Sequence, residues 1–121
     1  MNCPFCGAED EVLGNELAYA KFDAYPVSPG HLLIIPRRHA ADWFDLDSAE
    51  QQAILNLVSE AKLLLDEKYS PDGYNIGINC GEAAGQTIFH VHVHLIPRYA
   101  GDVEQPRGGV RGVIPAKRNY P

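Results

Sequence analysis

The sequence predicts an α+β fold in which one main helix packs against a mostly antiparallel sheet. Two segments typical of strands precede a single long helical pattern, and two more follow it, with short turns between them. The chain has 121 residues, of which 45% are hydrophobic, so it can form one domain with its own core.

The first two predicted strands lie before the helix. Residues 16–24 alternate well enough between polar and apolar side chains to predict a strand. The segment 26–30 contains two prolines and a glycine, which predicts a turn. Residues 31–35 form a nearly continuous apolar run that is stopped by Pro36, which predicts a buried strand.

The helix is predicted to begin after Asp47 and to end at Ser70-Pro71. Asp47 is a favourable N-cap residue, and Glu50 follows three positions later, as in a capping box. The apolar residues of this segment recur at helical spacing and predict contact with the core: Ile54, Leu57, Val58, Ala61, Leu64 and Leu65.

The last two strands follow the helix. Residues 73–79 predict a third strand, and residues 80–86, which contain two glycines, predict a tight loop. Three histidines at alternate positions, His90, His92 and His94, then lie in a run that alternates with apolar residues. This alternation predicts a strand with all three imidazoles on one face. Three titratable rings on one face are unusual for a core, so they indicate a chemical role.

Three explanations of this histidine row differ in geometry and chemistry: a zinc site, a site for phosphate chemistry, and histidines without a shared role. His90 and His94 would be about 13 Å apart at Cα in a straight strand, so three rings cannot bind one zinc ion. A row of imidazoles can instead supply a nucleophile, a proton donor and hydrogen bonds along a phosphate chain. The alternative is a solvated or partner-facing strand with three unrelated histidines.

Composition and charge narrow the possible partners. The formal charge of −6 argues against binding to a nucleic-acid polymer or an acidic membrane surface, but not against a small nucleotide. The chain has no apolar run of 18 residues, and residues 1–6 lack a signal-peptide pattern, so we expect a cytoplasmic protein. Residues 97–121 carry five Lys and Arg against two acidic residues. They are either a solvated tail or a flap that meets an anionic substrate.

The exposed edge of so small a sheet suggests self-association. An edge strand leaves main-chain N–H and C=O groups without partners, and pairing with a second copy satisfies them. We therefore expect a homodimer, with the sheet extended across it.

A pair of cysteines, Cys3 and Cys6, lies near the N-terminus with two residues between them. The pair alone is compatible with a redox function, with metal binding or with chance. In a cytoplasmic protein such a pair is more often metal-binding or catalytic than a stable disulfide.

The histidine row resembles the signature of the histidine triad (HIT) superfamily, His-x-His-x-His flanked by apolar residues. Residues 85–87 before it, residues 97–102 after it and the upstream segment 29–39 are similar to the same family. The resemblance extends from about residue 3 to about residue 102. It implies a HIT domain over residues 1–102, followed by a basic extension, residues 103–121, packed on or near the active site.

The resemblance also implies an activity, because members of the family are nucleotide hydrolases and transferases. It implies that His92 attacks an α-phosphorus to form a nucleotidyl-imidazole, which water then cleaves. Neutral imidazole is a suitable nucleophile near pH 7, and His94 can stabilise charge on the phosphate or the leaving oxygen. The resemblance implies substrate contacts from Asp23, His31, Asn79, Gln86 and Thr87. Phe5, Phe22 and Tyr25 are either part of an apolar slot for the base or ordinary core residues.

A bacterial branch of the same family binds structural zinc, and the chain resembles it at the cysteine pair. The resemblance implies that Cys3, Cys6, His39 and His90 form a closed Cys₂His₂ site. His90 would then bind metal while His92 and His94 contact phosphate.

Three functions remain open at this point. Residues 90–102 look closer to the branch that cleaves dinucleoside polyphosphates, so a hydrolase of such small nucleotides is the first. A purine nucleoside phosphoramidase would use the same His92 with an amine leaving group. A nucleotide-binding module with vestigial catalysis is the third, although binding alone does not need a nucleophile.

Overall fold

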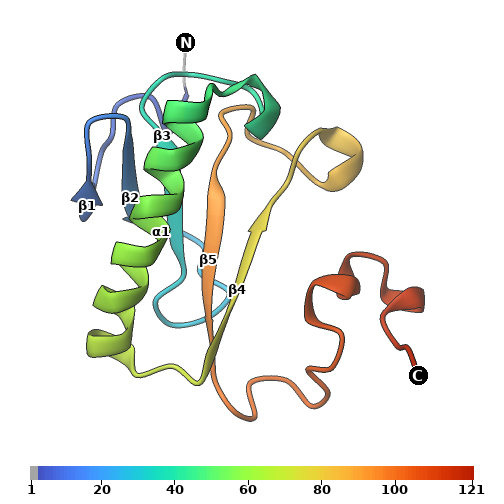
Figure 1. The fold of residues 1–121 in the computed structure, drawn as a ribbon. Helices are drawn as coiled ribbons and strands as arrows, with labels where there is room; N and C mark the ends of the chain where they lie inside the picture. The colour runs from blue at the N-terminus through green and yellow to red at the C-terminus, as the bar shows by residue number, and fades with distance from the viewer. Residues whose placement is uncertain (1–2) are drawn as a thin grey trace.

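The computed structural model describes residues 3–121 as an α+β domain, as the sequence predicts, and its sheet has five strands rather than the predicted four (Figure 1). The strand order is β1-β2-β3-β5-β4, and every neighbouring pair is antiparallel. The elements are β1 (Leu13–Gly14), β2 (Ala18–Phe22), β3 (Leu32–Pro36), α1 (Ser48–Tyr69), β4 (Gly73–Ile78) and β5 (Val93–Arg98). Residues 1 and 2, where the predicted domain starts, lie outside the described residues.

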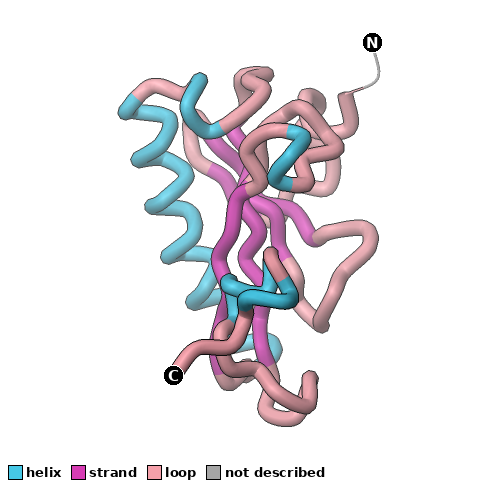
Figure 2. The backbone as a smooth tube through the Cα atoms, turned by 90° about the vertical axis from the view of Figure 1, so that its right-hand side faces the viewer, coloured by secondary structure: helices cyan, strands magenta, loops and turns pink. Residues whose placement is uncertain are grey.

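The helix α1 lies on one face of the sheet, and the long loops lie on the other (Figure 2). None of the helices within residues 3–121 combines the length and the apolar composition that crossing a membrane requires. The cytoplasmic location stays a prediction.

The main core fills the space between the sheet and α1. Alternate residues of β2, β3 and β5 meet the apolar stripe of the helix, which includes the fully buried Ile54, Leu57 and Leu65. A second, smaller cluster lies on the opposite face, where Phe5 of the N-terminal segment covers Leu33 and Ile35. Because β3 is covered on both faces, its sequence is continuously apolar rather than alternating.

The helix begins and ends where the sequence predicts. The Asp47 side chain accepts a hydrogen bond from the Glu50 amide, and the Glu50 side chain accepts one from the Asp47 amide. At the other end, Ser70 adopts a left-handed conformation (φ 49°), and its amide donates to the Asp66 carbonyl. Both ends therefore satisfy main-chain groups that a helix leaves unpaired.

The histidine strand is shorter than predicted, because β5 begins only at Val93. Leu33 pairs with His94 and Ile34 with Val93, so continuing this register would place Pro36 opposite Val91. Proline has no N–H to donate, and the Val91 amide instead donates to the Ala40 carbonyl at 2.9 Å. His90 and His92 therefore precede the regular ladder, although Val91 still packs into the main core and the rings face the other way.

Several smaller elements were not predicted. The two-residue β1 adds an edge strand, and β3 includes Pro36 instead of ending before it. The C-terminal extension, residues 103–121, contains two 3₁₀ turns, η3 (Gly109–Val113) and η4 (Pro115–Lys117), rather than an irregular tail. The extension lies beside β4, where η3 contacts the strand (Figure 1).

Candidate functional site

A cavity of about 300 Å³, the histidine cavity, opens on the sheet face opposite α1. It lies between the N-terminal segment, the β2–β3 turn, the loop before the histidines and the start of β5. All seven residues for which the sequence predicts a catalytic or substrate-binding role line it: Asp23, His31, Asn79, Gln86, Thr87, His92 and His94. Their side chains come from three separate segments, so the fold itself assembles the site.

The ring of His92 is held with one nitrogen available. Its Nδ1 lies 3.0 Å from the His90 carbonyl oxygen, and a carbonyl can only accept, so Nδ1 carries the proton. This leaves a lone pair on Nε2. The ring of Phe5 packs edge-on against the imidazole, with centroids 5.0 Å apart, and limits its rotation. His92 therefore presents an unprotonated nitrogen from a fixed ring.

The proton of His94 lies on the opposite nitrogen, because His31 fixes it. The Val27 amide donates to Nδ1 of His31 at 3.1 Å, so the proton of neutral His31 is on Nε2. That Nε2–H donates to Nδ1 of His94 at 2.9 Å. His94 therefore carries its proton on Nε2 and offers an N–H donor. Its ring centroid is 5.0 Å from that of His92, so a lone pair and a donor lie side by side.

The environment keeps both supporting rings neutral. Burial, followed by the nearby His92 and His31 rings, lowers the pKa of His94 to about 4. Burial also lowers the pKa of His31, although the Asp23 carboxylate, 3.5 Å from its Nε2, opposes the shift. Neutral rings near pH 7 are consistent with the tautomers assigned from the hydrogen bonds.

The predicted substrate contacts differ in what their side chains can offer. One Asp23 oxygen accepts from the Tyr25 amide at 2.8 Å, while the other faces His31. Thr87 is exposed, and its hydroxyl has no hydrogen-bond partner within residues 3–121. Asn79 is also exposed. These three side chains can each reach a ligand in the histidine cavity.

Gln86 is different because it braces the loop. It is buried, its side-chain oxygen accepts from the Gly81 amide, and its side-chain nitrogen donates to the Ala41 and Ile88 carbonyls. Its own amide donates to the Gly81 carbonyl. Gln86 therefore shapes the histidine cavity while its polar groups are already engaged.

The apolar part of the histidine cavity was only partly foreseen. Phe5 and Tyr25 line it, but Phe22 does not, because Phe22 faces the helix side and packs against Tyr69. Leu33 and Ile88 also line it and were not predicted. The signal for Leu33 is its position opposite His94 in the sheet, which requires the strand register and not only the sequence.

A second cluster of side chains lies next to the first. The candidate ligand atoms of Cys3, Cys6, His39 and His90 are all within 4.8 Å of one another. Cys3 Sγ lies 3.3 Å from His90 Nδ1, and Cys6 Sγ lies 3.2 Å from His39 Nδ1. Tetrahedral zinc, with bonds of about 2.3 Å to sulfur and about 2.0–2.1 Å to nitrogen, holds such atoms about 3.5 Å apart. The four residues therefore fit a zinc ion in donor type and in spacing.

His90 links the two clusters. Its buried Nε2–H donates to the Pro36 carbonyl at 2.7 Å, which leaves the Nδ1 lone pair facing the cysteine sulfurs. The main-chain carbonyl of the same residue accepts the proton of His92 Nδ1. The position of His90 thus sets both a candidate metal ligand and the tautomer of His92. Cys80, the third cysteine, lies outside the cluster.

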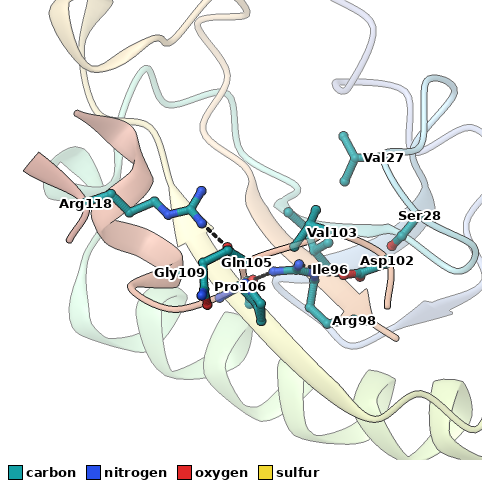
Figure 3. Close-up of a pocket in the computed structure, with 11 residues that line it drawn as sticks. Val27, Ser28, Ile96, Arg98, Asp102, Val103, Gln105, Pro106, Gly109 and Arg118 are labelled. Carbon is teal, nitrogen blue, oxygen red and sulfur yellow. Dashed lines mark hydrogen bonds and ion pairs between the residues drawn. The ribbon is translucent and has the colours of Figure 1, made fainter. Parts of the chain in front are cut away.

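A further cavity of about 320 Å³, the extension cavity, lies between the open face of β4–β5 and the C-terminal extension (Figure 3). It shares Val27 with the histidine cavity. Its other lining residues are Ser28, Asn75, Ile96, Arg98, Asp102, Val103, Gln105, Pro106, Gly109 and Arg118. The extension does not itself line the histidine cavity.

Known proteins resemble this chain in sequence and in fold. Residues 8–101 match the HIT domain family. The chain is 35% identical to AP-4-A phosphorylase of Mycobacterium tuberculosis over 92 residues, which are 75% of this chain and 47% of that protein. It is 37% identical to bis(5'-nucleosyl)-tetraphosphatase [asymmetrical] of Schizosaccharomyces pombe over 90 residues, which are 74% of this chain and 50% of that protein. The chain thus spans about half the length of these two relatives.

The fold resembles that of a zinc-bound histidine triad family protein from Mycobacterium smegmatis. The two structures superpose with a TM-score of 0.78 at 31% sequence identity. The match covers 87% of this chain and 81% of the other. At this identity and coverage, the likeness extends to sequence and is not confined to topology.

Proposed function

This chain belongs to the HIT domain family, and we propose that it cleaves dinucleoside polyphosphates at an α-phosphate through a covalent nucleotidyl-histidine intermediate. The observation that carries the proposal is the pair of opposite tautomers on His92 and His94. The activities named for the Mycobacterium tuberculosis and Schizosaccharomyces pombe relatives support this substrate class.

In the first step, Nε2 of His92 attacks the α-phosphorus. An N–P bond forms, the P–O bond to the neighbouring phosphate breaks, and its electron pair leaves with that oxygen. The Nε2–H of His94 donates a hydrogen bond to the oxygen as its negative charge grows. The cationic ring of the adduct keeps its Nδ1–H on the His90 carbonyl, which disperses the positive charge.

In the second step, water attacks the same phosphorus and the N–P bond breaks. His92 recovers its lone pair, and the products are a nucleoside monophosphate and a proton. A polyphosphate leaves as a stable anion, whereas an amine must be protonated as it leaves. Because the pKa of His94 is lowered to about 4, it is a hydrogen-bond donor rather than an acid near pH 7. This favours polyphosphate substrates over phosphoramidates.

The remaining predicted residues would bind the nucleotide. We assign the ribose hydroxyls to the Asp23 carboxylate, and contacts near the reacting phosphate to Thr87 and Asn79, because all three line the histidine cavity. Phe5 and Leu33 supply apolar walls for the base. His31 acts through His94, and Gln86 through the loop that it braces.

We also propose that Cys3, Cys6, His39 and His90 bind a structural zinc ion. The convergence of four donors and the orientation of His90 support this, as does the similarity to a zinc-bound protein. When bound, the ion would tie the N-terminal segment to the histidine strand and take no part in bond breaking. This assignment favours metal binding over a redox role for the cysteine pair.

A homodimer completes the proposal. Strand β4 ends the sheet and pairs only with β5, so no further strand pairs with its outer edge within the described residues, although η3 contacts part of β4. Ile76 in the middle of that strand is 53% exposed. A second copy pairing along this edge would cover both the apolar side chain and the main-chain groups.

The experiment that tests the activity compares wild type with His92→Ala on two substrates. Purified protein is incubated separately with diadenosine tetraphosphate and with an adenosine phosphoramidate, and the nucleotide products are followed. We expect faster cleavage of the dinucleotide, and a loss of about 10³-fold or more in the variant. Mass spectrometry after alkaline quenching should detect one nucleotidyl group on wild type and none on His92→Ala.

Other results have defined meanings. Faster cleavage of the phosphoramidate would replace the proposal with phosphoramidase activity on the same His92. Tight nucleotide binding without turnover or adduct would support a binding module instead. Equal rates for wild type and His92→Ala would contradict the nucleophile.

A further inference from the structure

We propose that the extension cavity is the subsite for the leaving half of the substrate, the anionic phosphates that depart with the second nucleotide. This inference rests on the proposed function, because a leaving polyphosphate exists only if cleavage occurs at the α-phosphate. It assigns Arg118 and the C-terminal extension a part in substrate selection.

The extension cavity continues from the histidine cavity along strand β5. His94, Ile96 and Arg98 alternate along β5 and therefore share its open face, each about 6.6 Å at Cα from the next. His94 lines the histidine cavity, while Ile96 and Arg98 line the extension cavity. Val27 forms part of both walls. A phosphate chain that leaves the α-phosphorus beside His94 and follows β5 enters the extension cavity.

The C-terminal extension is positively charged. Residues 103–121 contain four Lys and Arg but only one acidic residue, in a chain whose overall charge is −6. The ion pairs found within residues 3–121 involve none of these four cations. Arg98, by contrast, is held by both oxygens of Asp102 at 2.8 Å. Of these four cations, Arg118 lines the extension cavity. The extension therefore brings one positive charge that no carboxylate neutralises to a cavity beside the reacting site.

Contacts within the C-terminal extension preorganise its side of the cavity. Nε of Arg118 donates to the Arg107 carbonyl at 3.1 Å, and its guanidinium also donates to the Gln105 carbonyl (Figure 3). The guanidinium groups of Arg107 and Arg111 both contact the ring of Tyr120, at 4.9 and 5.0 Å from its centroid. These contacts fix the fold of the extension without neutralising its charge, so an anion need not order the chain when it binds.

The proposal predicts selection between leaving groups. A leaving nucleotide with its phosphates is stabilised by the positive charge in the extension cavity. A small neutral amine neither extends into that cavity nor carries a charge that it could stabilise. Changing the charge of the extension cavity should therefore alter cleavage of a dinucleotide and leave that of a phosphoramidate unchanged.

Two substitutions test this, each with a matched control. Asn75→Asp adds a negative charge to the cavity while keeping the oxygen that accepts from Arg98 at 2.7 Å. Asn56→Asp makes the same change on the exposed surface of α1, where the side-chain oxygen accepts from Gln52. Arg118→Gln removes a cavity charge, and Lys117→Gln removes a neighbouring one that does not line the cavity.

We expect Asn75→Asp and Arg118→Gln each to lower kcat/KM for diadenosine tetraphosphate about tenfold. A tenfold change corresponds to the free energy of a shift of about one pKa unit, which is typical of one nearby charge. Cleavage of the adenosine phosphoramidate should change less than twofold, and both controls should match wild type on both substrates. An equal loss on both substrates, or an equal loss in Asn56→Asp and Asn75→Asp, would overturn the subsite.

Binding separates this proposal from the proposed function. If wild type cleaves neither substrate, the proposed function fails, and calorimetry with diadenosine tetraphosphate still tests the subsite. Weaker binding in Asn75→Asp and Arg118→Gln alone would keep an anion site in the extension cavity. Equal affinity in wild type and all four variants would remove it.

Discussion

The side chains of His92 and His94 differ in which ring nitrogen carries the proton, and a third histidine produces that difference. The Nε2–H of His31 donates to His94 and forces the proton of His94 onto the nitrogen that the leaving oxygen would meet. His31 is almost fully buried, so its effect passes through His94. It is a positioning residue in the proposed mechanism.

Replacing His31 therefore tests the tautomer. His31→Leu removes the donor to His94 and should lower kcat for diadenosine tetraphosphate about 10²-fold, with little change in KM. His31→Gln places an amide N–H near the lost Nε2 and should recover part of kcat. Steady-state kinetics of the three proteins check this. Equal losses in the leucine and glutamine variants would mean that the hydrogen bond does not matter.

Single residues also mark how far the sequence could predict the site. The alternation of histidines placed His92 and His94 on the correct face, and the family resemblance brought in the distant Asp23 and Asn79. Nothing in the sequence distinguished the braced Gln86 from the free Thr87, because their difference lies in the carbonyls that surround them. The sequence did not predict that Leu33 and Ile88 line the cavity for a similar reason. The position of Leu33 depends on the strand register, and that of Ile88 depends on the path of the loop.

Among the elements, α1 was predicted to within a residue because its signals are local. The capping pair at its start and Ser70-Pro71 at its end act over three or four residues. The predicted start of β5 is wrong because the true start depends on Pro36, which lies more than 50 positions away in the sequence. Pro36 prevents the pairing of β3 and β5 from continuing to Val91. The sequence predicts no helix or strand in the extension because it has no apolar periodicity, and arginine contacts to carbonyls hold its two turns instead.

The start of α1 is also where one charged residue should stabilise an element strongly. Glu50 is buried, accepts from the Asp47 amide and pairs with Arg38 through both oxygens at 2.8 Å. Glu50→Ala should lower the free energy of unfolding by about 2 kcal/mol, since it removes the cap and leaves its partners without an acceptor. Glu60→Ala, on the exposed face, should cost less than about 0.5 kcal/mol. Urea denaturation measures both.

The same residue gives the stability of the helix a pH dependence. The Arg38 contact, followed by the Asp47 amide, lowers the pKa of Glu50 below its usual value of 4.5. A carboxyl group with a lowered pKa stabilises the fold above that usual value, and the effect is lost as pH falls below it. Glu50→Ala should therefore be less sensitive to pH below about 4.5 than wild type, and parallel slopes would contradict this assignment.

On the scale of the whole molecule, we propose that two copies pair along the outer edge of β4. Wild type should elute as a dimer in size-exclusion chromatography with light scattering. Ile76→Lys places a charge in the proposed seam and should give a monomer. Val12→Lys makes the same change at a half-exposed position outside β4 and should remain dimeric. A monomeric wild type, or two variants that behave alike, would exclude pairing at this edge.

The proposed zinc site joins Cys3 and Cys6 to His90, which lies more than 80 positions later in the sequence. Without the ion, weak thiol contacts, the Phe5 cluster and the hydrogen bond from the Tyr19 hydroxyl to the Phe5 carbonyl would hold the cysteine segment in place. Because the carbonyl of His90 sets the tautomer of His92, a shift of the cysteine segment that moves His90 should also disturb the orientation and protonation of the His92 ring. Metal binding, stability and activity are thus expected to change together.

Cys6→Ser tests this connection, with Cys80→Ser as its control because Cys80 lies outside the cluster. Wild type and Cys80→Ser should each contain one zinc ion per chain by elemental analysis. Cys6→Ser should contain much less, unfold at a temperature lower by about 5 °C or more, and lose part of its kcat. Loss of stability with unchanged kcat would limit the ion to holding the N-terminus. A zinc-free wild type with two reactive thiols would remove the site and return the cysteine pair to a redox interpretation.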